Sequence, residues 1–368
     1  MSEFRVKLVD TALGLLSPDM VIINGLLVNV LTRETYQADV IIKGNRIAAV
    51  GNASDYEIGK DCVVIDAKNQ YVAPGFMDAH FHIESSSITV SELAKFIVPK
   101  GITMVAEDPH EIANVFGMQG IEALYAEGRR VPLNFMLRVP GRVPALDESV
   151  ETSGASLSIE ETSELLDWPE ALCLAGDINP QLIINKDEQQ FEKYDLAISK
   201  KLTISGQSPG LAGKDLNAFI AAGAEDSHVS TSAEEVIDIL RHGMKAFLTD
   251  KPNRFDREEF NKLAKMVKSN GLDTRNICIV SDDTHANQLF REGHLDYRIR
   301  MAIEEGFDPI TAIQMVTINV AEHYKISRDY GSVSPGKYAD IILLDNLESI
   351  TVDKVIIHGE LVAEKGRL

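Results

Sequence analysis

The chain has few cysteines, few aromatic residues and no long apolar run. Its 368 residues include 3 cysteines, 1 tryptophan and 6% aromatic residues. Cys62, Cys173 and Cys278 lie far apart and form no C-x-x-C pair, so a disulfide framework or a zinc ribbon is not expected. No apolar stretch approaches the roughly 20 residues of a membrane span, and the N-terminus lacks a signal-peptide pattern. We therefore expect a cytoplasmic protein with reduced thiols.

Basic residues are also fewer than acidic residues. Lys and Arg number 36 against 56 Asp and Glu, which gives a formal net charge of -20. Such acidity argues against binding to nucleic acid or to an anionic membrane surface. We expect a small molecule as the partner, and self-assembly into a homo-oligomer stays an open alternative. The 45% hydrophobic and 25% charged fractions are those of an ordinary globular protein.

Short β-branched segments separated by turn residues occur near both ends of the chain. Because the two regions share this pattern, we expect them to form one small β-sandwich domain from residues 1–72 plus 333–368. The predicted strands are 20–23, 27–30, 38–42, 46–50, 339–344 and 352–359.

The region between these ends, residues 73–332, alternates apolar runs with amphipathic helical stretches. The runs are too apolar for a half-exposed sheet, which predicts a parallel sheet covered by helices. A length of about 250 residues is typical of a (β/α)8 barrel of the TIM type. A doubly wound open sheet is the alternative, but no G-x-G-x-x-G motif follows the first strand.

His80 and His82 form an H-x-H pair shortly after the small-residue turn at 73–75. Residues two apart on a strand share a face, so a strand here would direct both imidazoles into one space. Two imidazoles on one rigid strand make a preformed half of a metal site. Core or surface histidines also fall at this spacing by chance, but the flanking Asp78 and Glu84 favour metal binding.

Other apolar runs of the central region also end in potential metal ligands. Barrel enzymes carry their chemistry at the C-terminal ends of the strands. Nitrogen and oxygen ligands from several strands can converge there and leave a position open for water. The residues that follow the runs are His80, His82, Glu107 to Glu111, Asp177, Gln207, His228, Asp282 and Asp283.

Several of these residues have an ordinary structural alternative. The stretch from Asp108 to Glu111 fits an N-cap, a proline at N1 and a glutamate at N3, so His110 and Glu111 are as compatible with a capping box as with an active site. Asp282 could lie in a solvated turn, and His228 could be an exposed loop histidine. An acidic pair directly after a buried strand nevertheless favours function for Asp282. A structural or solvent-facing position is expected for the histidines at 242, 285, 294, 323 and 358.

Together these motifs resemble the amidohydrolase superfamily and, within it, the adenine deaminase family. The superfamily signature P-G-x-x-D-x-H-x-H is present from Pro74 to His82. The resemblance covers essentially the whole chain, and relative to the family we expect a short form that lacks the usual C-terminal domain. The more specific matches are His82 to Ser86, Asp108 to Val115, Pro209 to Asn217, Ser281 to Asp283 and Gly293 to Asp296.

The resemblance implies roles for individual residues. His80 and His82 would bind one metal, and Asp282 would bind it too and handle protons. Asp177 matches a bridging glutamate, and His228 matches a ligand of a second metal. The expected site residues are, as metal ligands, His80, His82, Asp177, His228 and Asp282; as catalytic groups, Asp282, His228 and Glu111; and as substrate-binding groups, Glu84, His110 and Arg142.

The chain departs from the family pattern at several positions. Gln207 stands where the family has a histidine, and an amide oxygen is a poor replacement for imidazole on a transition metal. We therefore expect one strong metal site and a weak or empty second site. Arg142 replaces a family cysteine near the mouth and could accept an anionic substrate group. Asp177 is not a lysine, which counts against the dihydroorotase type with its modified lysine.

The resemblance implies metal-dependent hydrolysis of adenine to hypoxanthine and ammonia, with Mn, Fe or Zn as the divalent ion. Two alternatives stay open. One is an amidohydrolase for a different cyclic substrate, such as an anionic one, which Arg142 favours. The other is a catalytically degenerate relative, which Gln207 favours.

Overall fold

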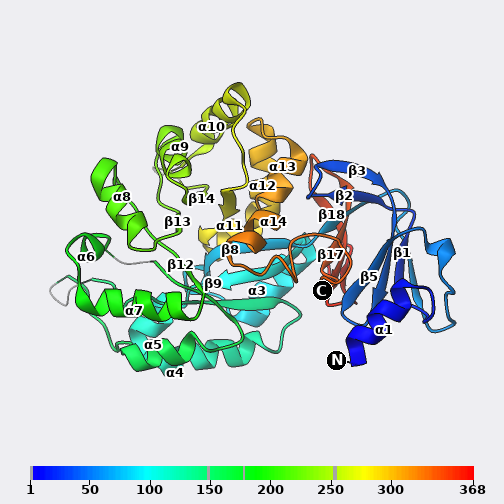
Figure 1. Ribbon diagram of the computed structural model, residues 1–368, viewed down its shortest axis with the longest axis horizontal. Coiled ribbons are helices and arrows are strands. Elements are labelled where there is room, and N and C mark those ends of the chain that lie inside the picture. The colour runs from blue at the N-terminus through cyan, green and yellow to red at the C-terminus, as the bar shows by residue number, and fades with distance from the viewer. Residues whose placement is uncertain (1–2, 147–149, 177–178, 252–254) are drawn as a thin grey trace.

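The computed structural model describes residues 3–146, 150–176, 179–251 and 255–368. Figure 1 shows two parts side by side: a larger part of strands and helices from the middle of the chain, and a smaller β-rich part in which the blue N-terminal and red C-terminal strands lie together. The candidate site residues lie in the larger part.

The larger part is built on parallel strands whose residues are almost all buried on both faces. This burial explains their continuous apolar sequences, because helices cover the outside of the sheet and side chains fill its inside. The strands are β8 (Phe76–His82), β9 (Ile102–Glu107), β10 (Asn134–Val139), β11 (Ala171–Leu174), β12 (Thr203–Ile204), β13 (Asp226–Ser227), β14 (Lys245–Thr249), β15 (Ile277–Val280) and β16 (Asp282–Asp283).

These strands follow one another around a closed ring. One sheet has the order β12-β11-β10-β9-β8-β16 and a second has the order β13-β14-β15, with parallel pairing throughout. Ser281 alone separates β15 from β16, which joins the two sheets on one side. On the other side, the backbone N–H of Glu225, just before β13, donates to the carbonyl of Ile204 in β12 at 2.8 Å. The structure thus has the predicted (β/α)8 barrel.

The helices begin where the sequence provides caps. Ser232 accepts a hydrogen bond from the backbone N–H of Glu235 at the start of α9, and Asp256 accepts from two backbone N–H groups at the start of α10. Helix α9 is one of the amphipathic stretches that alternate with the apolar runs. The helices of this part are α2 (Ile83–Ser86), α3 (Val90–Ile97), α4 (His110–Gly128), α5 (Ile159–Leu165), α6 (Gln181–Ile184), α7 (Glu188–Ser199), α8 (Gly213–Ala221), α9 (Ala233–Arg241), α10 (Arg257–Asn270), α11 (Ala286–Arg291), α12 (Leu295–Glu304), α13 (Pro309–Gln314) and α14 (Ile318–His323).

The smaller part contains two sheets, with the orders β5-β4-β1-β6 and β19-β18-β17-β7-β2-β3. The second sheet pairs strands from both ends of the chain, as the repeated strand pattern predicts, while the exact domain boundaries remain a prediction. Helix α1 has no counterpart among the predicted elements. The elements are α1 (Glu3–Ala12), β1 (Met20–Ile23), β2 (Leu26–Asn29), β3 (Glu34–Gln37), β4 (Asp39–Lys43), β5 (Arg46–Gly51), β6 (Val63–Asp66), β7 (Tyr71–Pro74), β17 (Ile341–Asn346), β18 (Thr351–Ile357) and β19 (Glu360–Glu364).

Among the described residues, none of the helices has both the length and the apolar character needed to cross a membrane.

Candidate metal centre

His80 and His82 both direct their rings into one buried space at the C-terminal end of β8. Their ring centroids lie 4.7 Å apart in an edge-to-face arrangement, and the two residues are 0% and 3% exposed. The pairing of β8 with β9 shifts register between Asp78 and Phe81, so the strand is irregular where the first histidine lies.

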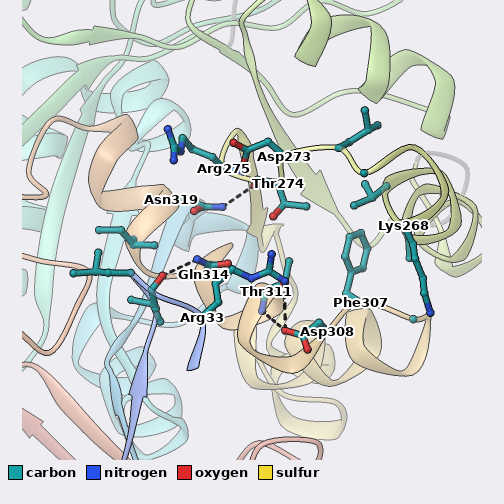
Figure 2. Close-up of a pocket in the computed structure, with 18 of the residues that line it drawn as sticks. Arg33, Lys268, Asp273, Thr274, Arg275, Phe307, Asp308, Thr311, Gln314 and Asn319 are labelled. Atoms are coloured by element: carbon teal, nitrogen blue, oxygen red, sulfur yellow. Dashed lines mark hydrogen bonds and ion pairs between the residues drawn. The ribbon is translucent and has the colours of Figure 1, made fainter. Parts of the chain in front are cut away.

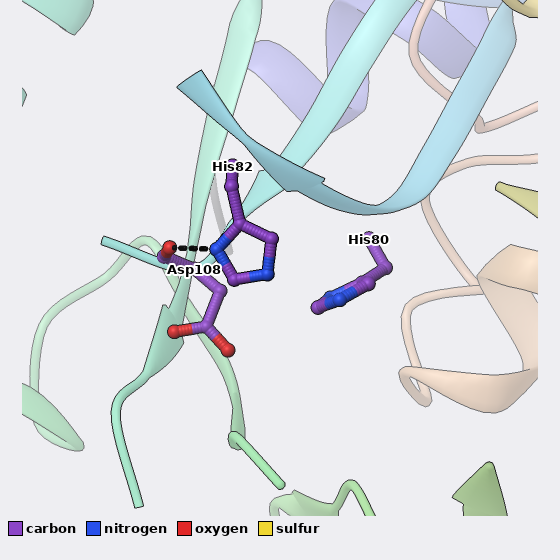
Figure 3. Close-up of side chains that lie close together, drawn as sticks. All are labelled: His80, His82 and Asp108. Atoms are coloured by element: carbon purple, nitrogen blue, oxygen red, sulfur yellow. Dashed lines mark hydrogen bonds between the residues drawn. The ribbon is translucent and has the colours of Figure 1, made fainter. Parts of the chain in front are cut away.

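The ring of His82 is oriented through Nδ1 (Figure 3). This nitrogen lies 2.9 Å from the backbone oxygen of Asp108 and 3.2 Å from Oε2 of Glu111. Both neighbours are oxygen acceptors, so Nδ1 carries the proton and donates it, and Nε2 is the nitrogen with a lone pair for a metal. Nε2 in turn lies 3.9 Å from Oδ1 of Asp282.

His80 carries the clearest sign of a missing partner. Within the described parts of the chain, neither of its ring nitrogens has a hydrogen-bond partner, although the side chain is fully buried. Burial lowers its pKa to about 3, and the charge of the Arg138 guanidinium contributes to the shift. The imidazole is therefore neutral at ordinary pH, which is the form that binds metals.

Asp282 lies in the same buried space as the two histidines, although it comes late in the chain, in β16. Its Oδ1 lies 3.5 Å from Nε2 of His80. Its φ of +54° places it in the left-handed region, which aspartate tolerates better than most residues and which turns the chain sharply after β15. Burial acts to raise the pKa of Asp282, but the close approach of His80, together with His228 and Lys251, outweighs it and holds the pKa well below the usual value, so the carboxyl is ionised at neutral pH.

His228 follows β13 and completes the group of three histidines. Its ring centroid lies 4.3 Å from that of His80, and the residue is 3% exposed. Nitrogen and oxygen atoms of His80, His228 and Asp282 all lie within 4.8 Å of one another. The alternative of an exposed loop histidine is therefore wrong for His228.

Asp108 belongs to this cluster, although the sequence pattern favours a helix cap for it. The capping-box prediction is wrong: α4 begins at His110, its N-cap is Pro109, and the cap makes no side-chain hydrogen bond. Asp108 is instead fully buried, and one of its oxygens lies within 4.8 Å of ring nitrogens of His80 and His82. Figure 3 shows the carboxylate lying beside the His82 ring. The D-P-x-E pattern is typical of a helix cap, but Asp108 directly follows a buried apolar strand, and in the structure this position determines where its side chain lies.

Asp78 ties β8 to the segment that carries Asp282. Its carboxylate accepts hydrogen bonds from the backbone N–H groups of His80 and Ser281, both at 3.2 Å, and from the Ser281 hydroxyl. Nε2 of His294 lies 3.1 Å from the second oxygen. The expected structural role of His294 agrees with this contact.

Glu111 and Glu84, expected as a catalytic and a substrate-binding group, lie near the cluster. Glu111, at the start of α4, contacts His82, and the hydrogen bond and charge of that histidine hold its pKa below the usual value despite burial. Oε1 of Glu84 accepts from the backbone N–H of Ile112 at 3.0 Å. Burial and the charge of Glu111 raise the pKa of Glu84. His110, the first residue of α4, is half-buried next to these carboxylates.

The sequence also singles out Arg142, Gln207 and Asp177. Arg142 lies 4.0 Å from a carboxylate oxygen of Asp187, which offsets its charge. Gln207 follows β12 and is half-buried. Asp177 lies outside the described residues, so the predicted bridging position stays a prediction.

Two cations near the cluster were not expected from the sequence. Nε of Arg138, in β10, lies 3.9 Å from Oδ2 of Asp108, and Nζ of Lys251, just after β14, lies 3.9 Å from Oδ2 of Asp282. Their only sequence signal is their place near the C-terminal end of a strand, which long basic side chains on the surface share.

A cavity of about 760 Å³ lies away from this cluster (Figure 2). It is found near the N-terminal end of β15, between the loop after β2 and helices α10, α13 and α14. Charges of both signs line it, including Arg33, Asp273 and Asp308, and none of the cluster residues does. Barrel enzymes carry their chemistry at the other end of the strands, so the cavity does not define the active site.

The cluster fits a divalent metal ion. Three imidazoles and two carboxylates converge, the donor set is that of a catalytic transition-metal site, and His80 is a buried polar side chain without a hydrogen bond. The fold and these side chains define a (β/α)8 barrel with a candidate metal centre at the C-terminal ends of its strands.

The chain belongs to the amidohydrolase family, whose model matches residues 71–362. It is 41% identical over 368 residues to an adenine deaminase of Clostridium botulinum and 40% identical over 375 residues to one of Moorella thermoacetica. These alignments cover 100% of this chain, and the chain spans 61% of the length of each relative.

Solved structures with low sequence identity share the fold. A crystal structure of enamidase aligns with a TM-score of 0.69 at 16% identity and covers 95% of this chain and 96% of that chain. An adenosine deaminase from Xanthomonas campestris with bound zinc aligns with a TM-score of 0.65 at 14% identity and covers 96% of this chain and 94% of that chain. At these identities the likeness concerns the fold alone.

Proposed function

We propose that this chain catalyses the metal-dependent hydrolysis of adenine to hypoxanthine and ammonia. The observation that carries the proposal is the buried cluster of His80, His82, His228 and Asp282 in a chain 41% identical along its whole length to an adenine deaminase. The chain spans 61% of the length of that relative, so the activity of this chain itself has to be measured.

The proposed metal ligands are His80, His82, His228 and Asp282, with Asp177 as a further candidate, and Asp108 joins them on the basis of its position. The ion is Mn, Fe or Zn, bound in one strong site. When bound, such an ion lowers the pKa of a coordinated water towards neutrality and so makes hydroxide available.

The residues of the chain position the reactants and move protons. Asp282, ionised and next to His80, accepts the proton of the attacking water, and His228 is the second group within reach. The proton then passes to the exocyclic nitrogen, which leaves as ammonia while the ring carbon gains oxygen. Glu111 holds the proton on Nδ1 of His82 and so keeps Nε2 directed at the site.

Glu84, His110 and Arg142 are the proposed substrate contacts. Glu84 and His110 lie at the starts of α2 and α4, and Glu84 accepts a hydrogen bond from the backbone N–H of Ile112 in the first turn of α4. Arg142 is farther along the chain after β10 and is engaged with Asp187, so it is the weakest of the three candidates for an anionic group.

The proposal is tested by incubating the purified protein, loaded with Mn²⁺, Fe²⁺ or Zn²⁺, with adenine. Hypoxanthine and ammonia in equal amounts support it, and no ammonia with any of the three ions overturns it. A panel that includes anionic cyclic amides and amidines detects an amidohydrolase with a different substrate.

A catalytically degenerate relative is the second candidate, because Gln207 takes the place of an expected histidine. Elemental analysis separates this candidate from the first. A folded protein that neither contains metal nor takes it up supports the degenerate relative.

A further inference from the structure

Each of the two buried carboxylates of the cluster, those of Asp108 and Asp282, lies beside a basic side chain. The distance from Nε of Arg138 to Oδ2 of Asp108 and the distance from Nζ of Lys251 to Oδ2 of Asp282 are both 3.9 Å. At this separation the charges interact strongly, because the surroundings are buried and the effective dielectric constant is far below that of water.

Arg138 is placed inside the barrel, where a guanidinium is costly without a counter-charge. It is 0% exposed, and its hydrogen bonds go to neutral groups: the carbonyl of Ala79 at 3.1 Å, the hydroxyl of Tyr324 at 2.6 Å and the hydroxyl of Ser205 at 2.8 Å. Asp108 is therefore a counter-charge for Arg138 as well as a candidate metal ligand.

A second buried carboxylate near Arg138 already has a partner. Asp226 accepts from the same Ser205 hydroxyl at 2.6 Å, and its other oxygen lies 2.7 Å from Nε2 of His323. Asp226 is thus paired with His323. Among the ion pairs described, the carboxylate that pairs with the Arg138 guanidinium is that of Asp108.

Lys251 lies beside Asp282 as Arg138 lies beside Asp108. Its side chain is 17% exposed, and Nζ also donates to the backbone carbonyl of Asp283. The lysine thus holds the end of β14 to the turn that carries Asp282 and leaves its charge beside that carboxylate.

We propose that Arg138 and Lys251 are positioning residues that balance the charges of Asp108 and Asp282 and thereby limit the centre to one divalent ion. The inference rests on the proposed metal site. Among the described candidate ligands, the histidines and Gln207 add no negative charge, so a second divalent ion would add two positive charges where Asp108 and Asp282 each already have a cation. Positive charge held by the protein replaces the charge that a second ion would supply.

The test uses Mn²⁺ as the probe, with no substrate present. Chelator-treated protein is titrated with Mn²⁺, bound metal is counted by elemental analysis after dialysis, and electron paramagnetic resonance distinguishes a single ion from a spin-coupled pair. The variants are Lys251→Met and Arg138→Met, which remove one charge each with little change in volume. Arg138→Lys is the conservative variant, which keeps the charge.

Lys245→Met is the matched control for Lys251→Met. Lys245 is a largely buried lysine in the first position of β14, at the opposite end of the same strand, and its Nζ donates to the carbonyl of Arg275 at 2.8 Å. Its removal takes away the same charge far from the cluster.

We expect one Mn²⁺ per chain and an uncoupled signal in the unaltered protein and in Lys245→Met. In Lys251→Met and Arg138→Met, the dissociation constant for a second ion should fall at least about tenfold, because one repelling charge is gone. Arg138→Lys should return the count to one. If Arg138→Met does not fold, Lys251→Met decides.

Two results overturn the inference: two coupled ions in the unaltered protein, or a second-ion affinity in Lys251→Met equal to that in Lys245→Met. Failure to release ammonia from adenine would overturn the proposed function and leave the metal count unaffected, so the two failures are distinguishable.

Discussion

The Nδ1–H group of His82 donates to the backbone carbonyl of Asp108 across 2.9 Å. The same aspartate places a carboxylate oxygen among the candidate metal ligands. One residue directly after β9 therefore orients a histidine with its backbone and faces the cluster with its side chain. The neighbouring strands β8 and β9 pair in parallel, which brings these two strand ends together.

Glu111→Gln should weaken metal binding. The second acceptor for Nδ1 of His82 would lose its charge, and partners of this kind are worth about 10- to 100-fold in metal affinity or activity. Mn²⁺ titration of the variant is expected to give a dissociation constant raised about tenfold or more. Glu122→Gln, on the exposed side of the same helix, is the control. Equal affinities in the two variants would show that Glu111 does not support His82.

Asp282→Asn should abolish most of the deaminase activity while the protein stays folded. Asparagine has the same shape and tolerates the left-handed backbone of this position, but it cannot accept a proton from water. Loss of a proton-transfer group costs about 10²- to 10⁴-fold in kcat. Ammonia release at saturating adenine measures the effect, and a thermal melt checks the fold. Activity within about tenfold of the unaltered protein would remove Asp282 from the proposed role.

Gln207→His should add an imidazole where the family pattern has one and so strengthen binding of a second ion. If Lys251 repels that ion, the double variant Gln207→His/Lys251→Met should bind it more tightly than either single variant. Elemental analysis at increasing Mn²⁺ concentration gives the counts. A count unchanged in both the single and the double variant would contradict the alignment of Gln207 with a ligand position.

The metal-free protein should lose stability as the pH falls from 6.5 towards 4, in part because of His80. Its pKa is about 3 in the folded state, against 6.5 ordinarily, so only the unfolded chain gains this proton in that interval. One such proton changes the free energy of unfolding by about 1.4 kcal/mol per pH unit. Urea denaturation across this range should therefore give a shallower pH dependence for His80→Asn. Parallel curves for the two proteins would contradict the neutral, buried state of His80.

Features with a short repeat in the sequence were predictable. The two-residue period of a strand indicates that His80 and His82 share one space, and the apolar runs at 103–106 and 277–280 mark β9 and β15. Asp282 follows from its place directly after such a run, because an acidic residue at the end of a buried strand requires a partner.

Features that depend on neighbours distant in sequence were not predictable in the same way. Asp108 has a local pattern that fits a helix cap, and only the pairing of β8 with β9 shows that its carboxylate lies near two histidines. Arg138 lies near the end of β10 and Lys251 lies just after β14, positions that basic residues on the surface also occupy. Their role depends on the two carboxylates that the closed barrel brings next to them.

Titration of chelator-treated protein with Mn²⁺, with ammonia release from adenine followed at each step, measures metal binding and deamination in one experiment. The rate should rise from near zero and reach its plateau at one ion per chain. A chain that binds Mn²⁺, Fe²⁺ or Zn²⁺ and still releases no ammonia from adenine, or a chain that binds none of these ions, would contradict metal-dependent adenine deamination.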